Sequence, residues 1–380
     1  MRKRKTLVRD MSYFARTLGH LDELNIKLIK EVYLRGPRNL SLIARNLNAP
    51  KRTVHARFIK LKKDGLLSIH ALPRFHKLGL INTLVFIEVK PGFYSLIAEI
   101  LKSHDYLFRL YFTLGYRNGI YAHFTIPVEK VKNFERYLED IRRSRAVADV
   151  SISYVGDFSS FLPNFNFFDV KNKIWIFDVE AYIADIQSGK FDRLRFKEPD
   201  TYKIEADKMD IAIIHWLQKD AMTRLASIAR MKGVSRSLVK YHYDAHVVDK
   251  LVDQYLVYTP RFIPHTSSFF LLELEFEDLP GLEKFSYSLA NTHYALLGSK
   301  ELRRHKVFME IEAPIEDTDT VIPFLIEKLA KECGLAGYFL SILRASTYYW
   351  KPIAVRLFGK DKGWEYREEK YAKALSMLPS

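Results

Sequence analysis

The hydrophobic pattern of the chain begins with three short helices. The first has apolar residues at helical spacing, at Ile26, Leu28, Ile29 and Val32. A second short helix is expected from Leu40 to Leu47, followed by a turn. Pro50 suits the first position of a third helix, whose buried face would comprise Val54, Phe58 and Leu61. This arrangement predicts a helix-turn-helix.

The next segments change to the pattern of strands. Gly65 ends the third helix, and LLSIHALPRF then predicts a small β wing in which Pro73 is tolerated because the strand is an edge. The following apolar runs read, in order, as strand, helix, two strands, helix and strand: TLVFIEV, GFYSLIAEILKSH, RLYFTL, GIYAHFTI, VEKVKNFERYLEDI and VSISYV. A βαββαβ order predicts an antiparallel sheet with both helices on one face, the ferredoxin-like arrangement.

The whole pattern occurs twice. The segment LSLIARNLNAPKRTVHARF, from Leu40, aligns without a gap with LASIARMKGVSRSLVKYHY, from Leu225, at an offset of 185 residues. Later matches keep the same order with offsets up to 189, at which Trp175 pairs with Trp364 and Tyr182 with Tyr371. A repeat of this length decides the domain count before any single motif is interpreted. We therefore expect an α+β protein of two tandem units, each a winged helix-turn-helix followed by a ferredoxin-like βαββαβ domain.

The repeat sets the expected domain boundaries. The predicted order is a first winged helix-turn-helix (1–79), a first ferredoxin-like domain with a terminal helix (80–190), a polar linker (191–207), a second winged helix-turn-helix (208–265) and a second ferredoxin-like domain with a terminal helix (266–380). Sheets of this kind leave apolar faces or edges exposed unless they pair. We therefore predict that the two sheet domains pair, within the chain or between chains.

Charge narrows the class of partner. Sixty Lys and Arg against 45 Asp and Glu give a formal net charge of +15, which favours a polyanion such as nucleic acid. The excess is concentrated in the first helix-turn-helix, where residues 1–64 hold 17 Lys and Arg against five acidic residues. Residues 208–258 hold eight against five, so the first unit is predicted to dominate binding to double-stranded DNA.

The sequence lacks the features of a membrane protein, a disulfide-bonded protein or a cofactor-dependent enzyme. No apolar run reaches the ~18 to 20 residues of a spanning helix, and the first residues lack a secretory signal, so we expect a cytoplasmic protein that does not bind a membrane. The single cysteine, Cys333, excludes an internal disulfide framework. A P-loop, a Rossmann glycine fingerprint and a nucleophile elbow are also missing from the sequence, so neither a cofactor nor an enzyme activity is predicted.

The candidate DNA-binding residues follow from how a helix-turn-helix docks, since the third helix enters the major groove by its N-terminal part. Base edges or phosphates are the expected targets of Lys51, Arg52, Thr53, His55 and Arg57 in the first unit, and of Arg236, Ser237 and Lys240 in the second. Phosphates alone are the expected targets of Arg45, Lys60, Lys62 and the N-terminal run Arg2, Lys3, Arg4 and Lys5. Each of these cations could instead be an ordinary solvated surface residue.

Two histidines of the second unit stand four residues apart. The spacing of His242 and His246 could place two imidazoles on one metal ion, but no HExxH motif or nearby cysteine supports such a site. The sequence therefore predicts DNA contact or simple surface histidines there, and no metal site.

The succession of helix-turn-helix, short wing and βαββαβ resembles the Lrp/AsnC family of archaeal and bacterial transcription regulators. LDELNIKLIKEV is similar to the opening helix of that family, LSLIARNL to its second helix and APKRTVHARFIKLKKDGLL to its recognition helix; HKLGL resembles the step into the effector domain. The resemblance covers almost the whole chain, twice. It implies a regulator whose sheet domains pair into a dimer, with homodimerisation of the chain as a further option.

The resemblance also implies a small-molecule effector. In that family an amino acid often binds near a Thr-Gly turn, and the matching residues here are Thr113, Gly115, Arg117 and Asn118. The acidic residue expected a few positions on is replaced by Arg117 and Asn118, so amino-acid sensing departs from the family pattern.

Three hypotheses remain at this point. The leading one is a sequence-specific DNA-binding transcription regulator. An enzyme is the first alternative, because fused siroheme decarboxylases have the same tandem arrangement; the charge of +15 and the lack of a histidine-tyrosine-arginine run argue against it. The other alternative is a recruiter of basal transcription factors, with one helix-turn-helix contacting protein instead of DNA.

Overall fold

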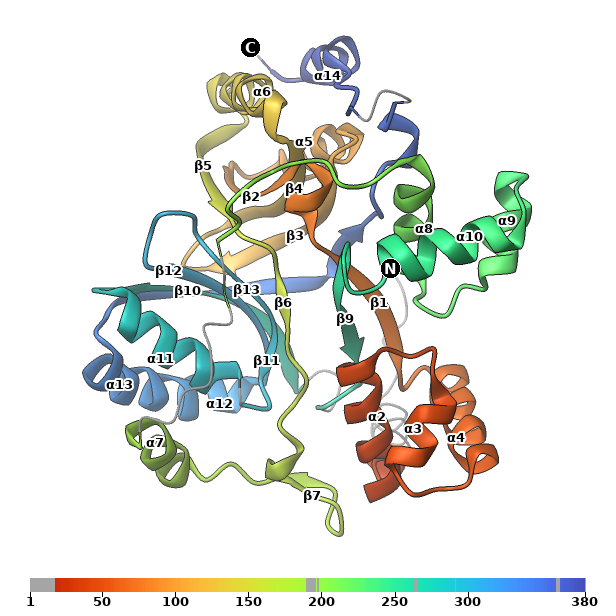
Figure 1. Cartoon of the computed structure of the whole chain (residues 1–380). Helices are drawn as coiled ribbons and strands as arrows, with labels where there is room; N and C mark the ends of the chain where they lie inside the picture. The colour runs from red at the N-terminus through yellow and green to blue at the C-terminus, as the bar shows by residue number, and fades with distance from the viewer. Residues whose placement is uncertain are drawn as a thin grey trace, which may run out of the picture.

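The computed structural model describes residues 18–188, 196, 198–262, 266–290, 292–359 and 363–379. Within these residues no helix is both long and apolar enough to cross a membrane. The N-terminal basic run, and residues 191–195 and 197 of the predicted linker, lie outside the described residues. Two helical heads lie on one side of the molecule, and a large sheet with its helices makes up the rest (Figure 1).

The first head has the three helices that the sequence predicts: α2 (Glu23–Arg35), α3 (Leu40–Asn46) and α4 (Lys51–Lys63). The Asp22 carboxylate accepts a hydrogen bond from the Asn25 amide at 2.8 Å and thereby begins α2. Gly65, at φ +71°, follows the end of α4 in a conformation that favours glycine.

The second head repeats the arrangement with α8 (Lys208–Lys219), α9 (Leu225–Lys232) and α10 (Arg236–His242). The recognition helix differs, since α10 has seven residues where α4 has 13 and continues into a π-helix, η4 (Tyr243–Val247).

The predicted wing is part of a contact between the two units. Strand β1 (Ser68–Pro73) pairs antiparallel with β9 (Val252–Tyr258), its counterpart in the second unit, as a separate two-stranded sheet. The pairing shifts register between Leu72 and Pro73, where the proline has no amide hydrogen to donate. The two heads are therefore joined by a strand from each, instead of each carrying a wing of its own.

The two ferredoxin-like domains form one nine-stranded sheet. The first contributes β2 (Leu80–Val89), β3 (Leu107–Gly115), β4 (Gly119–Pro127) and β5 (Val147–Val155); the second contributes β10 (Ser267–Phe276), β11 (Ala295–Lys300), β12 (Lys306–Pro314) and β13 (Leu335–Trp350). Antiparallel pairing of β3 with β13 joins them, and β6 (Ser159–Ser160) adds to the edge at β11. This confirms the predicted fold class and pairs the domains within one chain.

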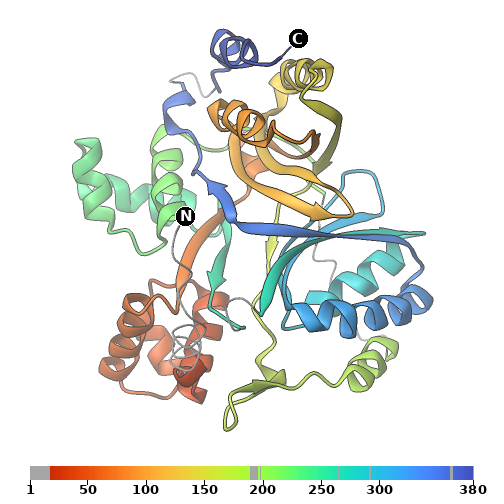
Figure 2. The same ribbon diagram turned by 180° about the vertical axis from the view of Figure 1, so that it is seen from behind.

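The sheet curls back on itself. Its two end strands are β5 and β6, which follow each other closely in the chain, and Val155 makes a β-bridge with Glu301 across the gap. Helices α5 (Tyr94–Ser103) and α6 (Val131–Arg143) accompany the first half, and α11 (Leu279–Ala290), α12 (Ile315–Asp319) and α13 (Val321–Cys333) the second (Figure 2). The side of the sheet away from these helices encloses a smaller core that includes Tyr121, Phe158 and Phe308.

The terminal helix of each unit packs on the other unit. Helix α7 (Val179–Gln187) lies against α13 of the second half, and α14 (Glu368–Leu375) lies against α5 and α6 of the first (Figure 1). Asp105 holds the second of these segments, because its carboxylate accepts hydrogen bonds from Lys370 at 2.7 Å and Tyr371 at 3.3 Å and also pairs with Arg356. The two units therefore exchange their terminal helices, whereas the predicted boundaries assign each terminal helix to the domain that precedes it in the chain.

Candidate nucleic-acid interface

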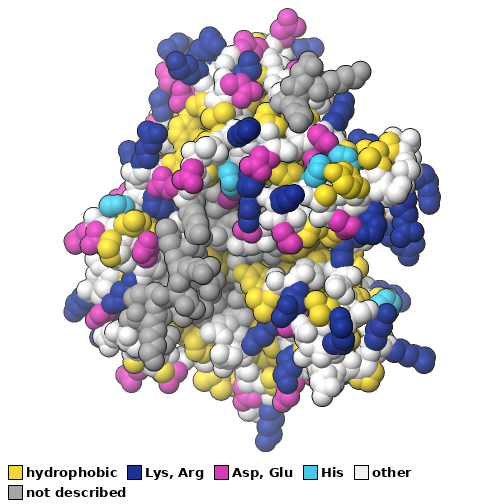
Figure 3. Space-filling view, in the orientation of Figure 1, with side chains coloured by type: hydrophobic (Ala, Val, Ile, Leu, Met, Phe, Trp, Pro, Cys, Tyr) yellow, Lys and Arg dark blue, Asp and Glu magenta, His cyan; other side chains and the backbone are white. Residues whose placement is uncertain are grey.

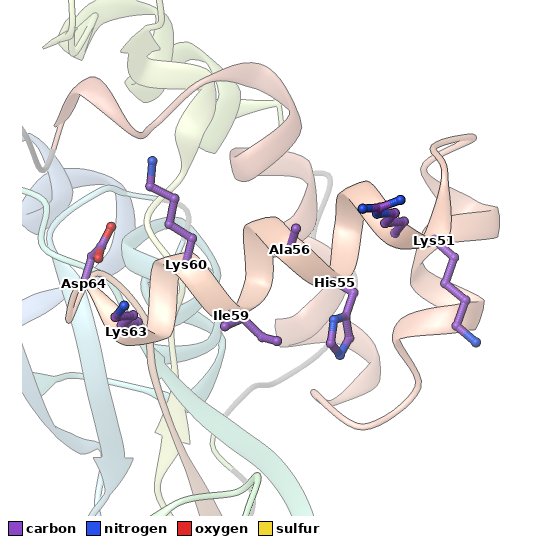
Figure 4. Close-up of a pocket in the computed structure, with 8 residues that line it drawn as sticks. Lys51, His55, Ala56, Ile59, Lys60, Lys63 and Asp64 are labelled. Atoms are coloured by element: carbon purple, nitrogen blue, oxygen red, sulfur yellow. The ribbon is translucent and has the colours of Figure 1, made fainter.

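Helix α4 presents a basic face to solvent. Its buried side, Val54, Phe58 and Leu61, packs into the core of the first head as the spacing predicts. The opposite side lines a shallow groove whose residues include Lys51, Arg52, His55, Ile59, Lys60 and Lys63, all of them exposed. Figure 4 shows these groove residues along α4, from Lys51 at its start to Lys63 at its end. Apart from Ile59, they are cations or hydrogen-bonding groups, the kinds that contact phosphates and base edges.

Figure 3 shows Lys and Arg side chains spread over the first head. Arg45, on α3, is exposed beside them, and Thr53 is half-buried at the start of α4. Lys51, Arg52, His55 and Lys60 therefore share one exposed face of α4, and Arg45 is exposed on the neighbouring helix α3.

Two of the predicted DNA-binding residues are engaged inside the protein. Arg57 donates to the Asp22 carboxylate at 2.5 Å and to the Asn25 amide oxygen at 3.1 Å, and so links α4 to the start of α2. Lys62 donates to both carboxylate oxygens of Asp220, at 2.7 and 2.8 Å, across the boundary between the two heads. These pairs explain why the two cations point away from the groove of α4.

The matching face of α10 is less basic and more apolar. Arg236 and Ser237 are exposed, while Lys240 forms an ion pair with Asp244 one turn along the helix. Leu238 and Tyr241 are 41% and 58% exposed on this short helix. The second head thus offers fewer free cations than the first to a DNA backbone.

The predicted effector turn lies at the junction of the two half-sheets. Thr113 is fully buried, and Gly115, at φ +107°, pairs with Ser341 of β13. Asn118 exchanges hydrogen bonds with the backbone of Gly115 inside the turn. The partly buried Arg117 donates to Ser151 at 2.7 Å and pairs with Glu273 at 3.3 Å.

The sheet encloses charged residues that the sequence analysis did not single out. Arg109 donates to Glu310 at 2.6 Å, and both side chains are about 95% buried. Burial raises the pKa of Glu310 although Arg109 opposes the shift, and burial next to Arg109 lowers the pKa of His123 well below its ordinary value. The only signal in the sequence was the position of these polar residues within otherwise apolar strands.

Beside these groups the sheet encloses a cavity of about 200 Å³. Among its lining residues Arg117 and Lys306 both pair with Glu273, so these cations are already neutralised. A second cavity, of about 600 Å³, lies between the first head and the β5–β6 connection. His76 lines it, with the Nδ1 atom held by Asp157, in surroundings that also include Glu198, Asp200 and Asp253.

No protein-family model matches the sequence, and no curated protein matches it. Among solved structures, the siroheme decarboxylase NirDL matches 94% of this chain and 99% of its own, with a TM-score of 0.58 and 13% identity. The same protein with an iron-uroporphyrin III analogue matches 93% and 99%, with a TM-score of 0.57 and 12% identity. Escherichia coli AsnC matches 36% of this chain and 91% of its own, with a TM-score of 0.31 and 17% identity.

The NirDL matches correct one expectation from the sequence. We predicted that the chain is not an enzyme, but the solved structures that match nearly its whole length are those of an enzyme. The similarity extends to the tandem arrangement of winged helix-turn-helix and ferredoxin-like domains. At 13% identity it shows the fold, and the function has to be argued from this chain's own residues.

Proposed function

We propose that this chain is a sequence-specific double-stranded DNA-binding protein that regulates transcription, with α4 as its main reading helix. The observation that carries the proposal is the exposed basic face of α4, with Lys51, Arg52, His55 and Lys60 on the third helix of a helix-turn-helix. A recognition helix contacts bases through its N-terminal residues and phosphates through flanking cations.

Contacts between the heads support a fixed reading geometry. Besides the pair of Lys62 with Asp220, the Arg38 guanidinium donates to the Thr223 carbonyl at 2.6 Å and stacks over Tyr243. Paired heads in one chain would approach neighbouring DNA segments together, as the two heads of a dimer do.

The direct test is selection of duplexes from a random pool with the full chain, followed by fluorescence anisotropy with a selected and a scrambled duplex. We expect tighter binding to the selected duplex, and affinity that falls steeply as salt rises. Arg143→Ala, which removes an exposed cation on the distant helix α6, is the matched control and should leave binding unchanged. Equal affinity for both duplexes would contradict sequence-specific reading.

A second function, binding and decarboxylation of an iron tetrapyrrole, is favoured by the match to NirDL over nearly the whole chain. The 600 Å³ cavity offers one imidazole, His76, which the Asp157 carboxylate orients and which could bind the iron of such a group. Two features weigh against it. This cavity is rich in acidic residues, which repel a polycarboxylate, and the 200 Å³ cavity is smaller than the ~300 to 1,000 Å³ of usual ligand pockets.

Titration of siroheme into the full chain, followed by visible absorbance, tests this second function. Saturation at one equivalent, lost in His76→Ala, would support it, and release of carbon dioxide would establish the activity. An absorbance change that does not saturate would rule out specific tetrapyrrole binding, and with it this second function. Neither outcome affects the DNA-binding test, which uses a different surface.

A further inference from the structure

Four potential metal ligands meet where α8 and α10 touch in the second head. Asp207 and Asp210 stand at the start of α8, and His242 and His246 at the end of α10 and in the π-helix after it. One ligand atom from each of the four lies within 4.8 Å of all the others. The spacing of the two histidines could be read along the chain, but the packing of the helices brings the two carboxylates to them.

The distances fit a common ligand. His242 Nδ1 lies 2.8 Å from Asp210 Oδ1 and 3.5 Å from Asp207 Oδ2, and His246 Nδ1 lies 3.3 Å from Asp210 Oδ2. A tetrahedral zinc ion with bonds of ~2.0 to 2.2 Å holds its ligand atoms about 3.3 Å apart. Small side-chain adjustments therefore suffice to place all four atoms around one ion.

The first head shows what this position does. At the repeat offset of 185, the four residues correspond to Asp22, Asn25, Arg57 and Leu61. There the guanidinium of Arg57 lies between Asp22 and Asn25, and supplies a permanent cation that ties the reading helix to the start of α2.

The second head has more negative charge here and no permanent cation. Asn25 is replaced by Asp210, whose side chain is 1% exposed, and Arg57 is replaced by His242. Within the part of the chain that the structure describes, neither Asp207 nor Asp210 pairs with a lysine or arginine. Asp210 Oδ2 accepts one backbone hydrogen bond, from the Asp207 amide at 2.9 Å, and a carboxylate buried to this degree requires a cation or further donors besides.

The local backbone orients side chains of the cluster toward one another. Asp207 uses Oδ1 to accept from the amides of Met209 and Asp210, which leaves Oδ2 directed at His242. The π-helix begins directly after His242, and short π-helical insertions occur often at functional sites. The ring of Tyr241 packs edge-on against both imidazoles, with centroids 5.6 and 5.4 Å away.

We propose that this cluster binds one divalent transition-metal ion, with Zn²⁺ the best match. The ligands are Nδ1 of His242 and His246 and one carboxylate oxygen each of Asp207 and Asp210. Imidazole and carboxylate ligands in a tetrahedral set suit zinc. The ion ties α10 to α8 at the position where Arg57 ties α4 to α2. The second reading helix is therefore held by a bound metal ion, and the first by the guanidinium of its own arginine side chain. This site is independent of whether either head binds DNA.

The test uses the full chain without an affinity tag, stripped of metal by a chelator. Titration with Co²⁺ should give visible absorbance of tetrahedral type that saturates at one equivalent, and Zn²⁺ should displace it. Added Zn²⁺ should also raise the melting temperature, because an ion that binds the folded state stabilises it.

The decisive variant converts the second cluster into the first. Asp210→Asn, His242→Arg and His246→Leu together install the residues of the first head, so the apo protein should fold with an unchanged circular dichroism spectrum and lose the Co²⁺ absorbance and the Zn²⁺ stabilisation. His55→Ala, which removes an exposed histidine outside the cluster, is the control and should bind normally.

A single change covers the case in which the triple variant does not fold. His246 is the more accessible of the two histidines, with its side chain 36% exposed, so His246→Gln should keep the fold. It should weaken the affinity for Zn²⁺ at least ~100-fold, because loss of a residue that only hydrogen-bonds to a metal ligand already costs up to ~100-fold. Absence of saturable Co²⁺ binding to the unmodified chain, or binding that persists unchanged in His246→Gln, would overturn the proposal.

Discussion

The two heads have the same three-helix scaffold and differ in what they present to solvent. In the first, the exposed side of α4 carries Lys51, Arg52 and Lys60. In the second, α10 is half as long, and exposed Leu238 and Tyr241 interrupt its cations. The difference teaches that the buried face of a helix preserves a fold while its exposed face is free to change partner, because only the buried face is constrained by packing.

The heads also differ in how they are anchored. The core of the first head is mostly its own, joined by Phe165 and Phe168 from the segment after β6. The core of the second head is continuous with that of the first ferredoxin-like domain. Ile353 of the C-terminal segment adds two hydrogen bonds to α8. Its carbonyl accepts from Nδ1 of His215 at 2.8 Å, and its amide donates to Oε1 of Gln218 at 2.9 Å.

The largest expected effect comes from removing charge from one head at a time. Lys51, Lys60 and Lys63 changed together to Ala should flatten the slope of log affinity against log salt by up to about 2.7, since each lost phosphate contact contributes ~0.9. The matched change of Lys232, Arg236 and Lys240 in the second head should alter the slope by less than ~0.9. Anisotropy titrations over a salt series measure both, and equal slopes would show that the heads contribute alike.

Next in size is the effect of the residue chosen to read a base. Arg52→Ala should cost about 1 to 3 kcal/mol of binding free energy and relax preference at one base position, as loss of an arginine–guanine contact does. Arg236→Ala should cost less. Repeating the duplex selection with each variant measures the change in preference, and a larger loss at Arg236 would reverse the assignment of the main reading head.

A loss of similar size, in stability and not in DNA binding, is expected when Asp105, which holds the C-terminal segment, is changed. Asp105→Asn weakens contacts to Lys370 and Arg356 and should cost about 1 to 3 kcal/mol of unfolding free energy. Burial raises the pKa of Asp105, but hydrogen bonds from Lys370 and Arg356 outweigh it and leave this pKa below its ordinary value of 3.8. The stabilisation is therefore present above pH ~4 and is lost as the pH falls through the lowered pKa.

Thermal unfolding at pH 7 and pH 3 checks this prediction, with the exposed Asp149→Asn as the control. Hydrogen exchange should rise in α8, which contacts the C-terminal segment, and stay unchanged in α2. A uniform rise in both helices would contradict the separate anchoring of the two heads.

The smallest effect concerns the contact between the heads. Lys62→Ala should weaken binding to selected and scrambled duplexes alike, by a factor of about two, because Asp220 already shares the charge of Lys62. Asp220→Ala should free Lys62 and strengthen binding by a similar factor. If both changes weaken binding, the ion pair matters for the placement of the heads more than for charge.

The sequence by itself determined the elements and their repetition. Helical spacing of Val54, Phe58 and Leu61 fixed the buried face of α4, and the βαββαβ order of apolar runs followed from period-two and period-3.6 patterns. These features depend on neighbours a few residues apart along the chain. For the same reason the exposed cations of α4 could be assigned in advance.

Only the tertiary structure decided which distant residues meet. The pairing of β1 with β9 and of β3 with β13, and the exchange of α7 and α14 between units, depend on strand edges and helix faces that have the same pattern whichever partner covers them. The engagement of Arg57 by Asp22, the buried pair of Arg109 with Glu310, and the meeting of Asp210 with His242 followed from that packing. Hydrophobic periodicity shows which side of an element is buried, but it does not show which charged group lies opposite.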